Sequence, residues 1–205
     1  VGGVSLEPLP QEFYAQSARQ LARDLLGRLV VSTIGGARCV ARIVETEAYL
    51  GPHDPASHAA LWRRTARTEV MYGEPGALYV YFTYGMHWCA NVVAEREGFP
   101  GAVLLRAVEP LEGVETMRRR RGGVADRLIS AGPARLAQAL GISGKHNGHR
   151  LDAPPLWIAA GTPVPRRAQL AGPRVGISQA VDWKLRFCLR DSPYLSPTPK
   201  RSSSG

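Results

Sequence analysis

Two extended segments near the middle of the chain constrain its fold more than any other feature. Cys39–Tyr49 is rich in β-branched and apolar residues, and Leu78–Thr83 and His87–Ala94 flank a short Tyr84-Gly85-Met86 break. This composition is typical of strands, and a short break between two strands is typical of a β-hairpin. We therefore expect a sheet that contains one long strand and an aromatic hairpin.

The other elements predict a mixed architecture. A helix is expected from the capping residue Ser17 to Leu26, where Gly27 stops it, and two more over Glu112–Arg121 and Asp126–Leu140. Further strands are expected at Leu29–Ser32, Ala102–Val108, Leu156–Ala160, Val175–Ile177 and Leu185–Leu189. In a chain of 205 residues these elements indicate one α+β domain over residues 1–195. Residues 196–205 are rich in Ser, Pro and Lys and are expected to be a disordered tail.

The charge of the chain favours a polyanionic partner. The formal net charge is +9 and the sequence pI is about 10.0. Such a surface attracts nucleic acid through counterion release, although a generic basic surface is the alternative. Three separated cysteines, with no C-x-x-C, argue against a zinc ribbon and a secreted disulfide framework. No apolar run is long enough to cross a membrane, so no membrane partner is expected.

The long strand carries an acid pair beside a phenol. Glu45, Glu47 and Tyr49 are two residues apart, so their side chains share one face of a strand. The two carboxylates would lie roughly 6–7 Å apart. Acids beside an aromatic surface suit a pocket for a planar substrate, with one acid acting as a base. A solvated strand face with salt bridges is the alternative.

The aromatic strand has two different faces. Alternation divides it into a face with Tyr79, Tyr81 and Thr83 and an apolar core face with Leu78, Val80 and Phe82. The tyrosine face can stack a nucleobase or belong to an ordinary amphipathic strand. At the turn, Tyr84 and Met86 place apolar groups in solvent unless they insert into a partner, for example between base steps of DNA.

Basic residues elsewhere are candidates for phosphate contacts. Arg63, Arg64 and Arg67 lie between the two segments, and the Gly132-Pro133 helix start offers backbone N–H groups to an anion. The Arg118–Arg121 run is either a phosphate site or a solvated helix end. The histidines have no metal-site spacing, and no phosphate-binding loop or dinucleotide motif is present. We therefore expect neither a metal nor a cofactor.

Several segments in order resemble the alkyladenine (3-methyladenine) DNA glycosylases. These are Arg42–Pro52, Ala56-Ser57-His58, Gly76–Met86, Asn91, Val103–Gly113, Gly132-Pro133, Leu136, Gln138–Leu140 and Arg174-Val175-Gly176. The resemblance covers roughly residues 10–195 and is far more specific than any single piece. It implies a single α+β domain with a curved, mainly antiparallel sheet, surrounding helices and a protruding β-hairpin.

The resemblance also implies a role for individual residues. Glu47 corresponds to the general base that activates water, and Arg106 and the Val175 carbonyl hold that water. Tyr49, His58 and Tyr81 form the pocket for the extruded base, Asn91 guards it against the amino group of guanine, and Leu104 lies nearby. Tyr84 fills the vacated place in the duplex from the minor groove. The predicted DNA-binding set is Tyr84, Met86, Arg63, Arg64, Arg67, Gly132 and Arg135. The choice of Glu47 over Glu45 as the base rests on the resemblance alone.

The function expected from the resemblance is monofunctional DNA glycosylase activity in base excision repair. Glu-activated water would hydrolyse the N-glycosidic bond of a flipped purine such as 3-methyladenine, 7-methylguanine, hypoxanthine or ethenoadenine. No lysine stands at a matched position, so no Schiff base is expected. The expected protein is a monomer in the bacterial cytoplasm, associated with the nucleoid. The alternatives are a non-catalytic damaged-DNA-binding protein and an enzyme acting on a free purine nucleoside.

Overall fold

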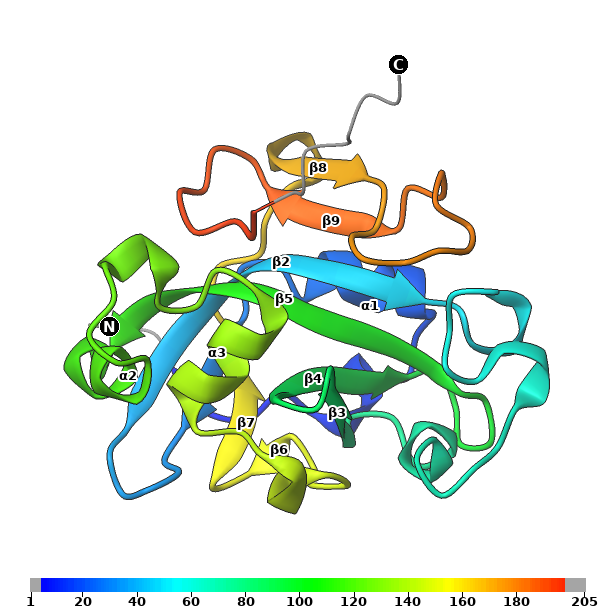
Figure 1. Cartoon of the computed structure of the whole chain (residues 1–205), viewed down its shortest axis with the longest axis horizontal. Coiled ribbons are helices and arrows are strands. Elements are labelled where there is room, and N and C mark those ends of the chain that lie inside the picture. Colours follow the sequence, from blue (N-terminus) through cyan, green and yellow to red (C-terminus); the bar gives the residue numbers. More distant parts are fainter. Residues whose placement is uncertain (1–4, 198–205) are drawn as a thin grey trace.

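A nine-stranded antiparallel sheet forms the centre of the protein in the computed structural model, which describes residues 5–197 (Figure 1). Its strand order is β3-β4-β5-β2-β1-β7-β6, and β9 joins the same sheet by pairing with both β2 and β8. The strands are β1 (Leu29–Ser32), β2 (Cys39–Tyr49), β3 (Leu78–Thr83), β4 (His87–Ala94), β5 (Gly101–Glu112), β6 (Asp152–Ala153), β7 (Leu156–Ala159), β8 (Gln169–Gly172) and β9 (Arg186–Leu189). The expected curved, mainly antiparallel α+β fold is confirmed.

Helices cover the sheet. The α-helices are α1 (Ala18–Asp24), α2 (Val114–Arg120) and α3 (Pro133–Leu140). Short 3₁₀ turns occupy Gln11–Phe13, Gly51–His53, Ala60–Trp62, Glu69–Tyr72, Asp126–Leu128, Gly144–His146 and Arg166–Ala168. Leu21 and Leu25 near α1, and Leu136 and Leu140 of α3, join one buried apolar cluster with the strands. Burial of this apolar surface is the main force that holds the layers together.

Strand β2 is the element on which the others are assembled. It pairs with β5 along one edge, and its other edge pairs first with β1 and then, over Glu45–Glu47, with β9. The Thr46 hydroxyl donates to the Ala22 carbonyl of α1, whereas Glu45 and Glu47 both reach Arg106. The two carboxylates therefore share one face of the sheet, as the alternation in the sequence predicts.

A β-bulge aims Arg106 at these carboxylates. Leu105 of β5 lies opposite Thr46 and Ala107 lies opposite Glu45, so Arg106 is the extra residue between them. Bulges of this kind redirect a side chain and are common next to active sites. The guanidinium of Arg106 consequently lies between Glu45 and Glu47.

Some sequence-based predictions of secondary structure were wrong. Val175–Ile177 is irregular backbone rather than a strand, and β5 extends through Glu112 where a helix start was expected. The predicted helix over Asp126–Leu140 is a 3₁₀ turn followed by α3, because Gly132 interrupts it with a φ of 137°. Strand β6 was missed because its two residues lie in a polar stretch that was assigned to a loop, although it pairs with the adjacent β7. Strand β8 was missed because its partner β9 comes from a later segment. Phe82 was assigned to the core but is exposed and stacks on Trp88.

The first residue of the predicted disordered tail is part of the folded domain. Ser196 is buried and hydrogen-bonded to Glu45, so it belongs to the folded domain. The rest of that prediction, residues 198–205, lies outside the described residues. Across residues 5–197, no helix combines the length and the apolar character that a bilayer-crossing segment requires.

Candidate active site

Strand register brings five widely separated side chains into one row across the sheet. Tyr79 pairs with Asn91, Asn91 with Leu104, Leu104 with Glu47, and Glu47 with Arg186. Residues directly opposite one another on antiparallel strands project from the same face. Strand β2, which carries the two acids, and the hairpin of β3 and β4 thus contribute to a single surface, although they are far apart in sequence.

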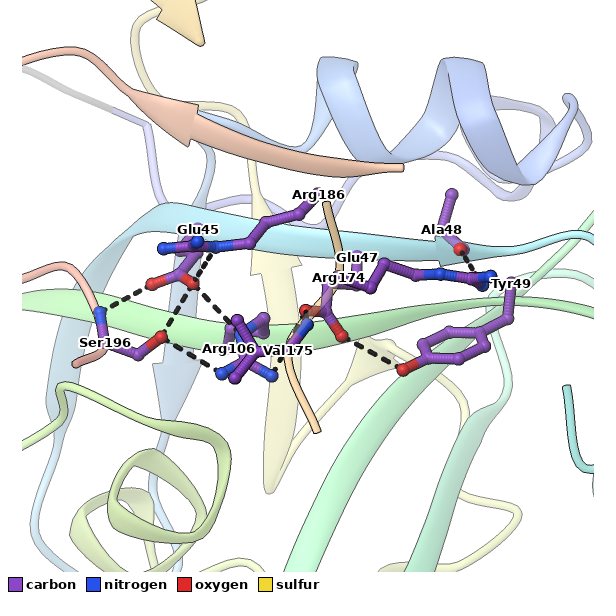
Figure 2. Close-up of polar contacts among 9 residues, drawn as sticks. All are labelled: Glu45, Glu47, Ala48, Tyr49, Arg106, Arg174, Val175, Arg186 and Ser196. Atoms are coloured by element: carbon purple, nitrogen blue, oxygen red, sulfur yellow. Dashed lines mark hydrogen bonds and ion pairs between the residues drawn. The ribbon is translucent and has the colours of Figure 1, made fainter. Parts of the chain in front are cut away.

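Glu47 is fully buried and holds three polar contacts (Figure 2). Its Oε1 accepts the Val175 N–H at 2.7 Å and lies 3.3 Å from Nη1 of Arg106. Its Oε2 accepts the Tyr49 hydroxyl at 3.0 Å. Burial raises the pKa of Glu47 above its ordinary value, although Arg106, the Val175 N–H and the Tyr49 hydroxyl each act to lower it. This is the environment of a carboxylate whose proton affinity has been increased.

Glu45 has a different set of partners. Its Oε1 accepts from Arg106 Nε at 3.0 Å, from Arg186 Nε at 2.7 Å and from the Ser196 hydroxyl at 2.7 Å. Its Oε2 accepts the Ser196 N–H at 2.6 Å. Four donors thus converge on this carboxylate, three of them on Oε1. The two acids therefore differ in their partners: Glu45 is bound by Arg106, Arg186 and Ser196, whereas Glu47 is bound by Arg106, Tyr49 and the Val175 N–H.

A buried ion pair supports the other side of Glu47. Arg174 binds the carboxylate of Asp54 through both terminal nitrogens and donates from Nη1 to the Ala48 carbonyl at 3.0 Å. Its guanidinium carbon lies 4.7 Å from the centre of the Tyr49 ring. Arg174 directly precedes Val175 in the chain. The ion pair thus fixes both the ring of Tyr49 and the backbone N–H that contacts Glu47.

A cavity of about 700 Å³ opens beside this cluster. Tyr49, Arg106 and Val175, which all contact Glu47, form part of its wall, so the Glu47 carboxylate lies directly behind that wall. The wall also includes most of the predicted pocket and several predicted DNA contacts, namely His58, Tyr81, Asn91, Leu104, Arg67, Tyr84, Gly132 and Arg135. A largely aromatic cavity with a few convergent polar groups is typical of a ligand-binding site.

Sequence comparisons decide the family. Residues 12–193 match the family "Methylpurine-DNA glycosylase (MPG)". A protein of Myxococcus xanthus, named "Putative 3-methyladenine DNA glycosylase", is 48% identical over 93% of this chain and 94% of its own length. Proteins with the same name from Chlorobaculum tepidum (43% identity over 98% of each chain) and Rhodopseudomonas palustris (48% identity over 92% and 90%) are similar over nearly their whole lengths.

The chain belongs to the methylpurine-DNA glycosylase family. The predicted resemblance is confirmed, and so is the expectation of a hydrolase of the DNA glycosylase class, which binds damaged DNA in the repair of alkylation damage.

In this glycosylase, His58 and two tyrosines form one aromatic corner of the cavity. Nδ1 of His58 lies 3.0 Å from the Tyr79 hydroxyl, and its ring meets Tyr81 edge to face at 4.6 Å. Burial, with a smaller contribution from Arg67, lowers the pKa of His58 to about 4. The imidazole is therefore neutral at neutral pH and offers one donor and one acceptor. Arg67 lies 5.0 Å above the Tyr81 ring.

Asn91 and Leu104 form the floor of the glycosylase cavity. Both are almost completely buried, and Nδ2 of Asn91 donates to the Tyr79 carbonyl at 3.1 Å. This bond fixes the orientation of the amide, so its position relative to a bound ligand is set by the sheet. Tyr79 itself was not among the predicted pocket residues, although its place on the tyrosine face of β3 pointed to it.

The mouth of the glycosylase cavity is formed by the hairpin tip and the start of α3. Tyr84 is 83% exposed with a φ of 51°, and Met86 is 67% exposed. Tyr84 and Gly85 both have positive φ, as a tight hairpin turn requires. Gly132 and Arg135 line the opposite rim, where Nη1 of Arg135 donates to the Ala131 carbonyl at 3.3 Å.

The remaining arginines divide into two groups. Arg63 and Arg64 are exposed beside Arg67, and Arg64 pairs with Glu69. The Arg118–Arg121 run instead bonds to its own surroundings: Arg118 pairs with Glu115 and Asp126, and Arg120 donates to the Ile34 and Ala139 carbonyls. The arginines of this run thus form a helix end that bonds to the protein itself, and the solvated helix end that was the alternative describes it only in part.

Sequence reasoning missed several residues of the site. Ser196, Arg186 and the Asp54–Arg174 pair reach Glu45, Glu47 or their neighbours from segments far away in sequence. The Val175 N–H donates to Glu47, a contact that the sequence did not predict. Among residues 5–197, no group of three or more His, Cys, Asp and Glu side chains is placed to hold a metal ion.

Proposed function

We propose that this protein hydrolyses the N-glycosidic bond of a damaged purine that has been flipped out of duplex DNA. The observation that carries the proposal is the buried Glu47 carboxylate, held by Arg106, Tyr49 and the Val175 N–H at the wall of an aromatic cavity. Because a base inside a duplex cannot reach such a cavity, the enzyme must extrude it.

Glu47 is the proposed general base. A water at the cavity wall beside Glu47 would attack the sugar C1′, and Glu47 would take one of the protons of that water. The C1′–N bond breaks, its electron pair leaves with the purine, and the hydroxyl oxygen stays on the sugar. The nearby carboxylate also stabilises the positive charge that develops on the sugar ring. Arg106 favours the ionised form of Glu47 against the effect of burial, and the Val175 carbonyl is a proposed second contact for the water.

The cavity suits a positively charged lesion. A protonated histidine would repel an alkylated, cationic purine, but burial keeps His58 neutral. Such a purine leaves as a neutral base without help from an acid, whereas hypoxanthine needs a proton from another source. Tyr49, Tyr81 and His58 would stack on and hydrogen-bond the base, and Leu104 would contact its edge. The fixed amide of Asn91 would exclude normal guanine through its amino group.

The exposed residues at the mouth are proposed to hold the duplex. Tyr84 would enter the minor groove and fill the gap left by the flipped base, with Met86 beside it. Arg63, Arg64, Arg67, Arg135 and the backbone at Gly132 would contact the backbone phosphates. The net charge of +9 supports this arrangement, in which the protein acts as a monomer.

Base release from duplex oligonucleotides tests the proposal. Substrates carrying 3-methyladenine, 7-methylguanine, hypoxanthine or ethenoadenine are compared with an undamaged duplex and with the free nucleosides. We expect release of the damaged base from at least one duplex, leaving an abasic site and an unbroken strand. Binding without release would indicate a damage-binding protein, and salt-insensitive release from free nucleosides would indicate a nucleoside enzyme.

Replacing Tyr84 with Ala should slow base release from duplex DNA. Because the gap left by the flipped base costs a few kcal/mol of stacking, losing the side chain that fills it should reduce the single-turnover rate about tenfold or more. The same lesion in a single-stranded oligonucleotide is the control, because no duplex gap exists there. Equal losses on both substrates would contradict the role of Tyr84 as a wedge.

A further inference from the structure

The Arg106 guanidinium is held from three sides by three different groups. Nε donates to Glu45 at 3.0 Å, Nη2 donates to the Ser196 hydroxyl at 3.1 Å, and Nη1 lies 3.3 Å from Glu47 (Figure 2). Only the last of these contacts involves the proposed base. The other two determine where the guanidinium sits.

Ser196 is hydrogen-bonded to both Arg106 and Glu45. Its hydroxyl accepts from Arg106 and donates to Glu45 Oε1 at 2.7 Å, while its N–H donates to Glu45 Oε2 at 2.6 Å. The residue is 6% exposed, and it lines the cavity beside Pro197. A serine hydroxyl has one proton to donate and lone pairs to accept, so it matches a position between a carboxylate and a guanidinium.

Arg106 needs such support because its backbone position alone does not fix its head group. It is the extra residue of a bulge, and an arginine side chain has many rotamers. Glu45 attracts it away from Glu47, and Glu45 is itself shared with Arg186. The bond from Nη2 to the Ser196 hydroxyl is a second fixed point, which restricts rotation of the guanidinium about its bond to Glu45.

We propose that Ser196, acting with Glu45, is a positioning residue that holds the Arg106 guanidinium against Glu47. The inference rests on the proposed function of Glu47 as the base. Ser196 comes from the chain segment after β9, so this segment supplies support to the site and contributes to the rate of the reaction rather than to DNA binding.

Ser196→Ala tests the proposal because it removes the hydroxyl and keeps the N–H bond to Glu45. We expect the single-turnover rate of base release to fall about ten- to hundredfold, as small displacements in an active site do. The dissociation constant for lesion duplex DNA should stay close to the wild-type value. Ser196→Thr restores a hydroxyl and should restore most of the rate.

The pH profile separates positioning from a loss of stability. Arg106 is the main group that lowers the pKa of Glu47, so its displacement in Ser196→Ala should move the acidic limb of the rate profile to higher pH. The charged and titratable groups around Glu47 are Glu45 and Tyr49 of β2, Arg106 of β5, Arg186 and Cys188 of β9, and Arg174. All of these are retained in the variant.

Ser192→Ala is the matched control. Ser192 lies in the same segment and accepts only the Tyr194 N–H at 3.3 Å among the contacts described, so its removal should leave the rate and the profile unchanged. The proposal is overturned if folded Ser196→Ala has the wild-type rate and acidic limb, or if its rate falls only with its folded fraction. It is also overturned if folded Ser196→Thr is as slow as Ser196→Ala. Absence of base release by the wild-type protein would instead overturn the proposed function.

Discussion

Replacing Glu47 with Gln is expected to reduce single-turnover base release from lesion duplex DNA about 100- to 10,000-fold, the usual contribution of a general base. Gln has nearly the same shape and can still accept the Val175 N–H, but it cannot take a proton from water. Binding to the same duplex should be retained, because the carboxylate lies behind the cavity wall. A variant that keeps its rate within tenfold of the wild type would remove Glu47 from the mechanism.

The stability of the same variant should depend on pH in a defined direction. Burial raises the pKa of Glu47 in the folded state above its value in the unfolded chain. The protonated form is therefore favoured by folding, and this stabilisation is lost as the pH rises through the folded-state pKa. Gln never ionises, so Glu47→Gln should gain stability relative to the wild type as the pH rises from the unfolded-state pKa of a glutamate, about 4.3, toward the higher folded-state pKa of Glu47. Urea unfolding at several pH values measures this difference, and a difference that is constant or reversed would contradict it.

Replacing Arg106 with Met should strongly destabilise the fold. The substitution leaves Glu45 and Glu47, both fully buried, without the cation between them. Removing one partner of a buried ion pair lowers the free energy of unfolding by about 3–5 kcal/mol. Urea denaturation at pH 7 measures the loss directly.

The loss caused by Arg106→Met should shrink in acid. Without Arg106, the pKa of Glu47 rises further, so the carboxylate takes up a proton at a higher pH and no longer carries a buried charge. Arg42→Met is a matched control on the same pair of strands, because Arg42 pairs with Glu109 in a partly exposed ion pair. It should cost at most about 1 kcal/mol, with little dependence on pH. Equal losses in the two variants would show that the buried cluster has no special electrostatic role.

Features set by local periodicity could be read from the sequence. Alternation along β2 placed Glu45, Glu47 and Tyr49 on one face, and alternation along β3 placed Tyr79, Tyr81 and Thr83 on the cavity side. A strand repeats every two residues regardless of its partners, so these predictions needed no tertiary information. The same is true of the hairpin turn, where Gly85 permits the positive φ that the turn needs.

The placement of the supporting groups was decided by tertiary structure alone. Arg106 faces the two acids because of a bulge, which depends on how β5 registers against β2. Arg174 and Asp54, separated by 120 residues, meet only because the loop before Val175 folds back over β2. The sequence separation between Ser196 and Glu45 is 151 residues, so composition predicted a disordered tail where the chain is in fact held by hydrogen bonds.

The sequence by itself determined that two acids and a phenol share a strand face near an aromatic hairpin, but it could not distinguish the acids physically. The tertiary structure distinguishes them. Glu45 accepts from four hydrogen-bond donors of β5, β9 and the segment after β9, whereas Glu47 is bound by Arg106, Tyr49 and the Val175 N–H, and burial raises its pKa. The physical reason is that a carboxylate's proton affinity depends on its burial and on the charges around it, and these are properties of packed, non-local contacts.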